Sequence, residues 1–238
     1  MKKETALTVV GGSGEMFDRI AARYDLMNQI ISLGLDRGWR KSLVSSLGVP
    51  QGGQVLDVAT GTGDVALAIA STHTDSRVIG LDPSEGMLEV GRKKVDKKAM
   101  TQRVRLDFGD AQEMPYESNT FDAACISFGI RNVPNRVQGL SEMTRVTKPG
   151  GRVCILELSE PRGSIFSPFA RFHVHHVVPL LGALLSGDWE YRYLQKSIAA
   201  FPPPQEFSKV MEEAGLENIT TKGFLFGVAH LYVGHVPG

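Results

Sequence analysis

Short apolar runs alternate with helical patterns along most of the chain. Five runs are of strand type, and we expect strands at 54–58, 77–81, 104–108, 123–127 and 152–158. Other segments have apolar residues at helical spacing, and we expect helices at about 64–71, 84–98, 135–146 and 204–214. Strands that alternate with helices predict a parallel sheet covered by helices.

The last part of the chain departs from this alternation. Residues 160–200 are rich in aromatic, histidine and other apolar residues, and we expect them to form a helical insert. The segments 217–223 and 228–235 then predict a closing pair of strands. The pattern predicts an α/β fold with a doubly wound, Rossmann-like sheet of seven strands, mostly parallel, with the last strand antiparallel.

A helical segment precedes the sheet. Met16, Ile20, Tyr24, Met27 and Ile31 recur at helical spacing, and a short helix with Trp39 is expected at about 37–47. Since both helices come before the first strand, we expect residues 15–47 to form an added lid rather than part of the sheet. We expect Trp39 to pack in the core, whereas Tyr24 fits packing and function equally. Residues 1–238 are predicted to form one domain, with 160–200 as a lid.

A glycine-rich turn follows the first strand. The stretch 55–64 reads Val-Leu-Asp-Val-Ala-Thr-Gly-Thr-Gly-Asp and opens the next helix. Gly61 and Gly63 lack a Cβ, so the backbone can turn sharply and approach a ligand closely. Ligands of doubly wound sheets bind at the carboxyl ends of the strands. Candidate ligand-binding residues at or near such ends are Asp57, Gly61, Asp82, Asp110 and Ser127.

The acidic residues indicate the kind of nucleotide. The turn fits the loose dinucleotide fingerprint, and Asp82 lies near the offset of a ribose-binding acid, so a nicotinamide dehydrogenase is one interpretation. Asp57, however, precedes the turn, where its carboxylate would repel a pyrophosphate and attract an ammonium or sulfonium group. Asp110 follows a third strand. Three such acids suit S-adenosylmethionine, which has an amino group, a ribose diol and an adenine.

Composition excludes several other classes. The 26 basic and 26 acidic residues balance, so no basic surplus indicates a nucleic-acid partner, and any membrane contact must be mainly apolar. Cys125 and Cys154 lie in apolar strand runs and are expected to be buried free thiols of a cytoplasmic protein. His173 and His176 share a helix face without an evident third ligand, so we expect a lid or interface role there and no metal.

Several stretches resemble the C-methyltransferases of menaquinone and ubiquinone biosynthesis. The resemblance runs from about residue 16 to 236 and is carried by 55–64, 109–111, 121–122, 126–133 and 156–161. The narrower motifs are 127–133, 24–28 and 193–202. It implies S-adenosylmethionine as the cofactor, with contacts from Thr62, Asp82, Asp110, Ala111 and Ser127. The residue types fit: Asp82 can accept both ribose hydroxyls, and Asp110 can accept from the adenine amino group.

The rest of the donor site follows from position. We expect Asp57 to face the amino group of the donor, and Gly61, Thr62 and Gly63 to line its methionine part. The alternative for Asp82 and Asp110 is that they are ordinary carboxylates that cap turns.

The resemblance also implies an acceptor site, and it implies that residues 15–47 cover the active site. Arg131 and Asn132 follow the fourth strand, where a permanently cationic Arg131 can stabilise a phenolate and Asn132 can orient an oxygen. Tyr24, with Asp25, is a further candidate for acceptor contact. The alternative for Arg131 is an ion pair with Asp122 or Glu157. Asp36 stands where the family usually has histidine, so no histidine role carries over.

The implied reaction is methylation of a ring carbon of a prenylated quinol. Demethylmenaquinol is the first choice of acceptor, and the benzoquinol of ubiquinone biosynthesis, or both rings, is the alternative. A non-catalytic S-adenosylmethionine-binding assembly protein is a further alternative. The apolar insert 160–200 is suited to a prenyl tail, to a homodimer interface, or to both. Such a substrate implies peripheral contact with the inner face of the membrane.

Overall fold

The computed structural model describes residues 18, 21, 25, 32, 34–160 and 188–238. Tyr24, His173, His176 and most of the predicted insert lie outside the described residues. Of the segment 15–31 the structure describes Asp18, Ala21 and Asp25, all three in helical conformation. The predictions of a cover at 15–47, a lid at 160–200 and a single domain therefore stay predictions.

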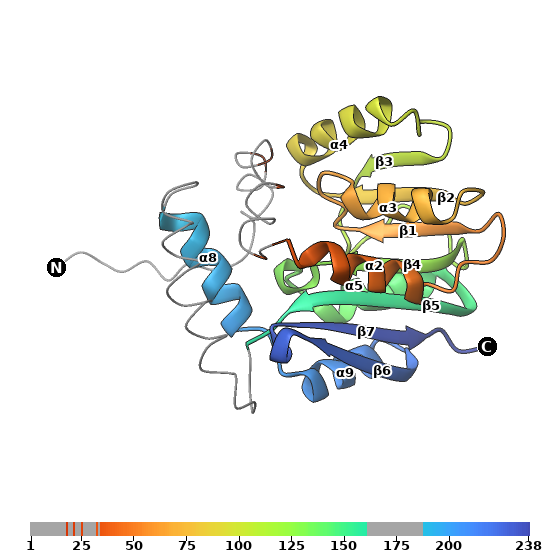
Figure 1. The fold of residues 1–238 in the computed structure, drawn as a ribbon. Helices are drawn as coiled ribbons and strands as arrows, with labels where there is room; N and C mark the ends of the chain where they lie inside the picture. Colours follow the sequence, from red (N-terminus) through yellow and green to blue (C-terminus); the bar gives the residue numbers. More distant parts are fainter. Residues whose placement is uncertain (1–17, 19–20, 22–24, 26–31, 33, 161–187) are drawn as a thin grey trace.

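A seven-stranded sheet forms the centre of the molecule, with the strand order β3-β2-β1-β4-β5-β7-β6 (Figure 1). Its strands are β1 (Gln54–Val58), β2 (Arg77–Asp82), β3 (Val104–Phe108), β4 (Phe121–Ser127), β5 (Thr147–Leu158), β6 (Glu217–Phe224) and β7 (Ala229–His235). The first five run parallel, and β7 is antiparallel to both β5 and β6. The predicted fold class is confirmed.

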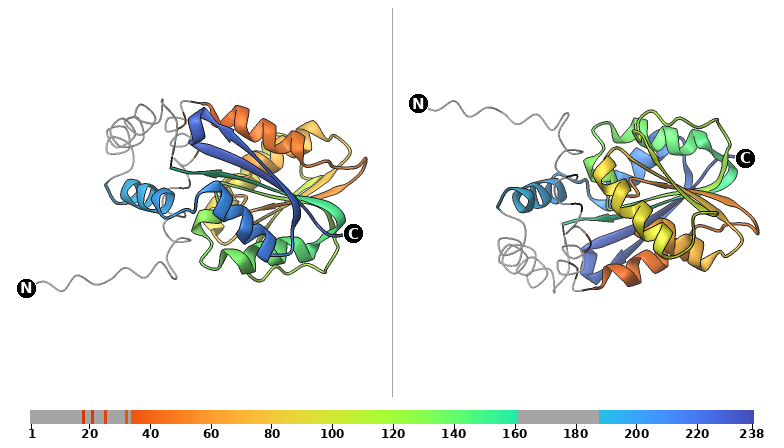
Figure 2. Two further views of the ribbon diagram at one scale, coloured as in Figure 1. Left: turned by 90° about the horizontal axis from the view of Figure 1, so that it is seen from below. Right: turned by 90° about the horizontal axis from the view of Figure 1, so that it is seen from above.

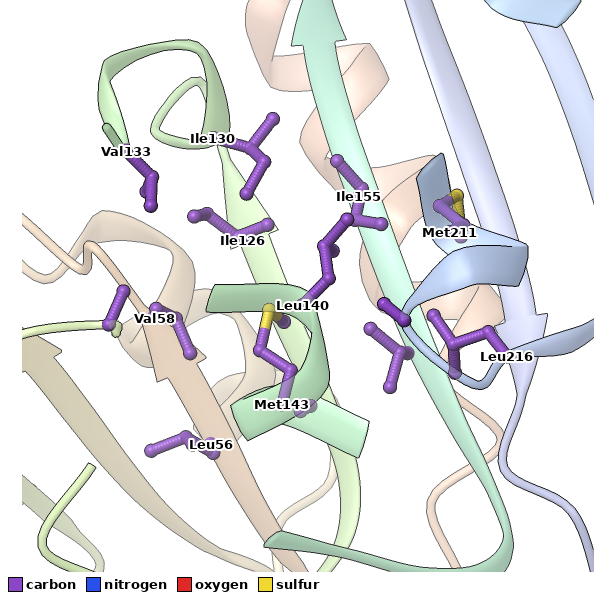
Figure 3. Close-up of a cluster of buried hydrophobic side chains, with 14 of the residues drawn as sticks. Leu56, Val58, Ile126, Ile130, Val133, Leu140, Met143, Ile155, Met211 and Leu216 are labelled. Atoms are coloured by element: carbon purple, nitrogen blue, oxygen red, sulfur yellow. The ribbon is translucent and has the colours of Figure 1, made fainter. Parts of the chain in front are cut away.

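Helices cover both faces of this sheet (Figure 2). They are α2 (Asp36–Ser46), α3 (Asp64–Thr72), α4 (Glu85–Lys97), α5 (Arg136–Val146) and α9 (Pro204–Glu213). Helix α8 (Asp188–Ala199) instead lies beyond the carboxyl ends of the parallel strands (Figure 1). One buried apolar cluster joins the sheet to α2, α3 and α4, and a second joins it to α5 and α9. Figure 3 shows the second cluster, where Ile126 and Ile155 of the strands meet Leu140 and Met143 of α5.

Helix α2 is a packed layer of the core. Trp39 is 7% exposed, and its ring lies 6.4 Å from that of Phe128 and 6.1 Å from that of Phe224. Leu43 and Val44 are buried in the same cluster. The predicted core role of Trp39 is confirmed. By this packing α2 fixes the position of Arg40, which lies on the same helix.

Strand β5 is longer than the hydrophobic pattern predicts. The expected strand starts at residue 152, but β5 begins at Thr147, which pairs with Phe121 of β4. The carbonyl of Gly151 accepts from the N–H of Val236, and the N–H of Gly150 donates to the carbonyl of Val236. Hydrogen bonds with the chain terminus therefore keep this glycine segment within the sheet, which hydropathy alone does not reveal.

The two cysteines and the lengths of the apolar helices can also be compared with the sequence analysis. Cys125 and Cys154 are buried free thiols, as predicted. Within the described part of the chain, no helix is both long and apolar enough to cross a membrane.

Candidate functional site

A small pocket opens at the carboxyl ends of β1 and β4. Its lining comes from the turn after β1, the start of α3, α2 and the end of β4, and consists of Asp25, Arg40, Asp57, Ala59, Thr60, Gly61, Thr62, Asp64, Val65 and Ser127. Four of the predicted donor-binding residues are therefore brought together: Asp57, Gly61, Thr62 and Ser127. The buried hydroxyl of Ser127 has no hydrogen-bond partner among the described residues.

Strained backbone lies beside this pocket. Ala59 after β1 has φ 51° and Phe128 after β4 has φ 59°, in the left-handed region that residues with a side chain rarely adopt. The strand ends also approach closely, since a Cβ added to Gly129 would lie 2.6 Å from the Cβ of Ala59. Strain of this kind concentrates where a site requires a particular backbone shape. Gly129 is therefore fixed by close packing.

Asp57 is a buried carboxyl at the end of β1, 1% exposed. Its Oδ2 accepts a 2.6 Å hydrogen bond from the hydroxyl of Thr60, and its Oδ1 accepts from Sγ of Cys125 at 3.5 Å. Burial raises the pKa of Asp57 to about 6, against the opposing effect of these hydrogen bonds. A cationic group bound beside Asp57 would compensate for this burial and favour the ionised carboxylate.

Asp82 connects β2 to the glycine turn. Its Oδ2 accepts from the N–H of Gly61 at 2.8 Å, and its Oδ1 accepts from the N–H of Ser84 at 2.9 Å. Burial raises the pKa of Asp82 to about 6 as well. Each oxygen keeps a second lone pair for another donor. Asp82 is thus a structural carboxylate with acceptor capacity to spare.

The remaining predicted donor-binding residues lie beside the pocket. Gly63 has φ 78° and stands as the N-cap of α3. Asp110 is exposed and accepts from the N–H of Gln112 at 2.8 Å, so it caps the turn after β3. Ala111 is 9% exposed and belongs to the apolar cluster under α5. Ligand contact by Asp110 and Ala111 stays a prediction.

A charged network that the sequence analysis missed borders the turn. The hydroxyl of Thr62 donates to Oδ1 of Asp25 at 2.6 Å, and Lys94 of α4 forms an ion pair with the same Asp25. Lys94 also pairs with Asp64 at 2.7 Å. Asp25 was expected near the acceptor, but here it contacts the donor turn. Only the tertiary fold brings Lys94 next to Thr62, so no sequence motif indicated this network.

Arg131 forms a buried ion pair. Its Nη1 lies 2.6 Å from Oε1 of Glu157 and also donates to the carbonyl of Phe128 at 2.6 Å. The side chain of Arg131 is 7% exposed and that of Glu157 is fully buried. The alternative of an ion pair with Glu157 is therefore observed, whereas Asp122 pairs with Lys148 at 2.7 Å. A contact of Arg131 with a phenolate stays a prediction.

Asn132 is held by a residue far away in the sequence. The phenol of Tyr193 on α8 donates to Oδ1 of Asn132 at 3.2 Å. Burial raises the pKa of Tyr193, so this phenol stays protonated at neutral pH. The motif at 193–202 supported the resemblance, but no role was assigned to Tyr193. In Figure 1, α8 lies beyond the carboxyl ends of the parallel strands.

Comparison with known proteins identifies the family of this chain. Residues 4–236 match the model of the ubiE/COQ5 methyltransferase family. The chain belongs to the ubiE/COQ5 methyltransferase family. The resemblance noted in the sequence is thereby confirmed, and the nicotinamide dehydrogenase interpretation is set aside.

Relatives within this family are similar over almost the whole chain. A ubiquinone/menaquinone biosynthesis C-methyltransferase of Geobacter sulfurreducens is 44% identical over 92% of this chain and 86% of its own length. A demethylmenaquinone methyltransferase of Bacillus mycoides is 43% identical over 94% of both chains.

Solved structures share the fold at lower sequence identity. The complex of a Haloferax volcanii methyltransferase activator with a methyltransferase contains a chain with a TM-score of 0.69 and 19% identity, which covers 93% of this chain and 98% of that one. An Aquifex aeolicus SAM-dependent methyltransferase has a TM-score of 0.58 at 18% identity, and the match covers 83% of this chain and 89% of that one. These two structures agree with the predicted methyltransferase fold.

Proposed function

We propose that this methyltransferase uses S-adenosylmethionine to methylate a ring carbon of a prenylated quinol, with demethylmenaquinol as the acceptor. The names of the relatives from Bacillus mycoides and Geobacter sulfurreducens support this reaction. The name of the second also includes ubiquinone biosynthesis, so the benzoquinol of that pathway is the second candidate acceptor.

The observation that carries the donor site is the convergence on one pocket of Asp57 and the Ser127 hydroxyl, which has no hydrogen-bond partner among the described residues. The donor has a cationic amino group and a sulfonium, which suit the carboxylate of Asp57. Its ribose diol suits the remaining lone pairs of Asp82, and its adenine suits the strand end with Asp110 and Ala111. Gly61, Thr62 and Gly63 face the methionine part. The donor supplies an electrophilic methyl group.

The acceptor site is proposed beside Asn132, Arg131 and Tyr193. Oδ1 of Asn132 accepts from Tyr193, so the Asn132 amide has its N–H₂ as a donor for a ring oxygen. Arg131 is fixed by Glu157 and provides a cation close by. A donated hydrogen bond and a nearby cation both favour the phenolate form, which is the electron-rich form that attacks the methyl group. Tyr24 is proposed as a further contact, although it lies outside the described residues.

Access to a membrane substrate is proposed through the tip between β6 and β7, the 3-10 turn η3 (Leu225–Gly227). Leu225 is 43% exposed and Phe226 is 52% exposed, and both have positive φ, at 43° and 55°. The tip lies on the same side of the molecule as α8, at the carboxyl ends of the parallel strands (Figure 1). We place the protein in the cytoplasm with peripheral contact at the inner membrane face. A homodimer through 160–200 is a separate proposal.

Methyl transfer from labelled S-adenosylmethionine tests the proposal, with reduced demethylated naphthoquinol and benzoquinol offered separately. Label in the naphthoquinol alone is expected. Label in both rings would favour a dual-pathway enzyme. Label in neither ring, with donor binding intact, would overturn the proposed reaction and favour the non-catalytic assembly protein.

A further inference from the structure

Arg40 stands out among the residues that line the donor pocket. It is the one basic side chain among the described lining residues, which also include the carboxylates of Asp25, Asp57 and Asp64. Helix α2 supplies it, and its side chain is 14% exposed. Neither the sequence motifs nor the family resemblance assigned it a role.

The guanidinium of Arg40 is held in place by its neighbours, but not all of its N–H groups make hydrogen bonds to the described residues. Its Nη1 donates to Oδ2 of Asp64 at 3.2 Å, and its Cζ lies 5.8 Å from the centre of the Phe128 ring. Its Nε is 3.5 Å from Oδ2 of Asp36 but makes no hydrogen bond within the described part of the chain, although it is buried. A guanidinium has five N–H donors in a planar fork that matches a carboxylate. Arg40, which lines the pocket, therefore has a buried N–H donor that no acceptor among the described residues satisfies.

The neighbouring carboxylates also have partners other than Arg40, so they do not fully neutralise its positive charge. Lys94 pairs with both Asp25 and Asp64, so these two carboxylates already have a cationic partner other than Arg40. Asp36 accepts from the hydroxyl of Ser32 at 2.7 Å. A second anion could therefore be accommodated at Arg40, and the pocket would otherwise repel it because three of its lining residues are acidic.

The proposed donor has one anionic group, the α-carboxylate of its methionine part. We propose that Arg40 binds this carboxylate, so that the core helix α2 forms one wall of the donor site. The inference rests on the proposed donor pocket. Asp57 and Arg40 then divide the zwitterion between them, with the ammonium at the aspartate and the carboxylate at the arginine. Donor selectivity follows, because a ligand without the carboxylate loses the arginine contact.

Binding of two ligands that differ in one group tests this assignment. The first is S-adenosylhomocysteine, and the second is S-adenosyl-3-thiopropylamine, which is the same molecule without its carboxylate. For Arg40→Gln we expect S-adenosylhomocysteine to bind roughly 10- to 100-fold more weakly, the range for a hydrogen bond to a charged group. The affinity for the decarboxylated ligand should change less than about twofold. Arg40→Lys should fall between, because it keeps the charge but loses the fork.

Arg105→Gln is the matched control, because Arg105 is exposed on β3 and pairs with Asp107. It should leave both affinities unchanged. Thermal melting of each variant checks that it folds. If Arg40→Gln and Arg40→Lys each lowered the affinity for both ligands by the same factor, the assignment would be overturned and Arg40 would be a structural residue. An unchanged affinity of Arg40→Gln for S-adenosylhomocysteine would also overturn it. The assay contains no acceptor, so a wrong quinol assignment would not affect its result.

Discussion

The N–H of Gly61 donates a 2.8 Å hydrogen bond to the carboxylate of Asp82, across the carboxyl ends of β1 and β2. The second oxygen of Asp82 accepts from Ser84, the N-cap of α4. One buried carboxylate thus holds the glycine turn and the start of a helix in a fixed relation. The same carboxylate is the proposed acceptor for the ribose hydroxyls, so Asp82 both fixes the backbone of the site and binds the ligand in this proposal.

Asp82→Ala should abolish measurable donor binding, and Asp82→Asn should weaken it by about 100-fold or more. Hydrogen bonds to charged groups contribute about 1.5–3 kcal/mol each, and Asp82 makes several. Titration calorimetry with S-adenosylhomocysteine measures the effect. Asp75→Asn is the control, because Asp75 accepts from the N–H of Gly52 at 2.8 Å but lies at the opposite ends of the strands. An affinity of Asp82→Asn within threefold of the wild type would contradict this role.

Donor affinity should depend on pH near 6. Burial raises the pKa of Asp57 and of Asp82 to about 6, and the ionised forms are the ones that receive an ammonium and the ribose hydroxyls. Protonation therefore opposes binding, and affinity should fall as the pH drops from 7 to 5. The slope should approach about tenfold per pH unit for each proton taken up.

Asp57→Asn separates the two groups. It should bind more weakly at pH 7 and lose about one proton of the pH dependence, while the part that belongs to Asp82 remains. Calorimetry at a series of pH values gives both quantities. If the donor affinity of Asp57→Asn depended on pH as steeply as that of the wild type, the protonation of Asp57 would not be coupled to donor binding.

Arg131→Ala should spare donor binding and remove turnover. Arg131 is proposed to face the acceptor, so its loss affects the reaction rather than the pocket of Asp57. Removing it also leaves Glu157 buried without its partner, which costs about 3–5 kcal/mol of folding stability. Donor affinity, melting temperature and initial rate are therefore measured on the same preparation.

The variant Arg131→Ala with Glu157→Gln addresses the stability loss, since it removes both charges of the pair. It should melt at a higher temperature than Arg131→Ala and remain inactive. Glu157→Gln alone keeps the cation and should keep methyl transfer. If Arg131→Ala kept the wild-type rate, Arg131 would be structural.

The Tyr193→Phe variant should lower kcat by roughly tenfold, the effect of losing about one hydrogen bond. Without the phenol, Oδ1 of Asn132 loses its donor and the amide is free to turn. Binding of S-adenosylhomocysteine should not change, because Tyr193 is not among the residues that line the donor pocket. Steady-state rates and calorimetry together test this, and a loss of donor binding with kcat intact would contradict it.

The sequence predicted most of the fold because strand and helix patterns here are local. Strands β1 and β3 match the expected ranges, and α4 and α5 begin one residue after the expected starts, because Ser84 and Asn135 are their N-caps. The early start of β5 was missed, because hydrogen bonds to Val236 near the end of the chain, not hydropathy, hold that segment.

The candidate site was predicted in part for the same reason. Strand-end acids such as Asp57 and Asp82 follow from the alternation of strands and helices. Arg40 and Lys94 could not be found this way, since each lies on a helix face and meets the pocket or its turn only through tertiary packing. Tyr193 stood in a recognisable motif, but its hydrogen bond to Asn132 spans a long stretch of chain.

Leu225→Ser with Phe226→Ser should reduce binding to lipid vesicles, because burial of two large apolar side chains contributes about 1.5–3 kcal/mol each. Co-sedimentation with vesicles of bacterial lipid composition measures this. Phe108→Ser is the control, since Phe108 is 62% exposed on the edge strand β3, away from the tip. Equal losses in the two proteins would show that the tip has no special part in membrane contact.

The central claim is that the methyl group goes to a ring carbon of a quinol. The most direct measurement incubates the protein with S-adenosylmethionine labelled in its methyl carbon and reduced demethylmenaquinol, and then locates the label in the product by NMR. The account predicts the label on a ring carbon of the naphthoquinol, in the wild type and not in Arg131→Ala. Label on a quinol oxygen, or no product while donor binding is intact, would contradict it.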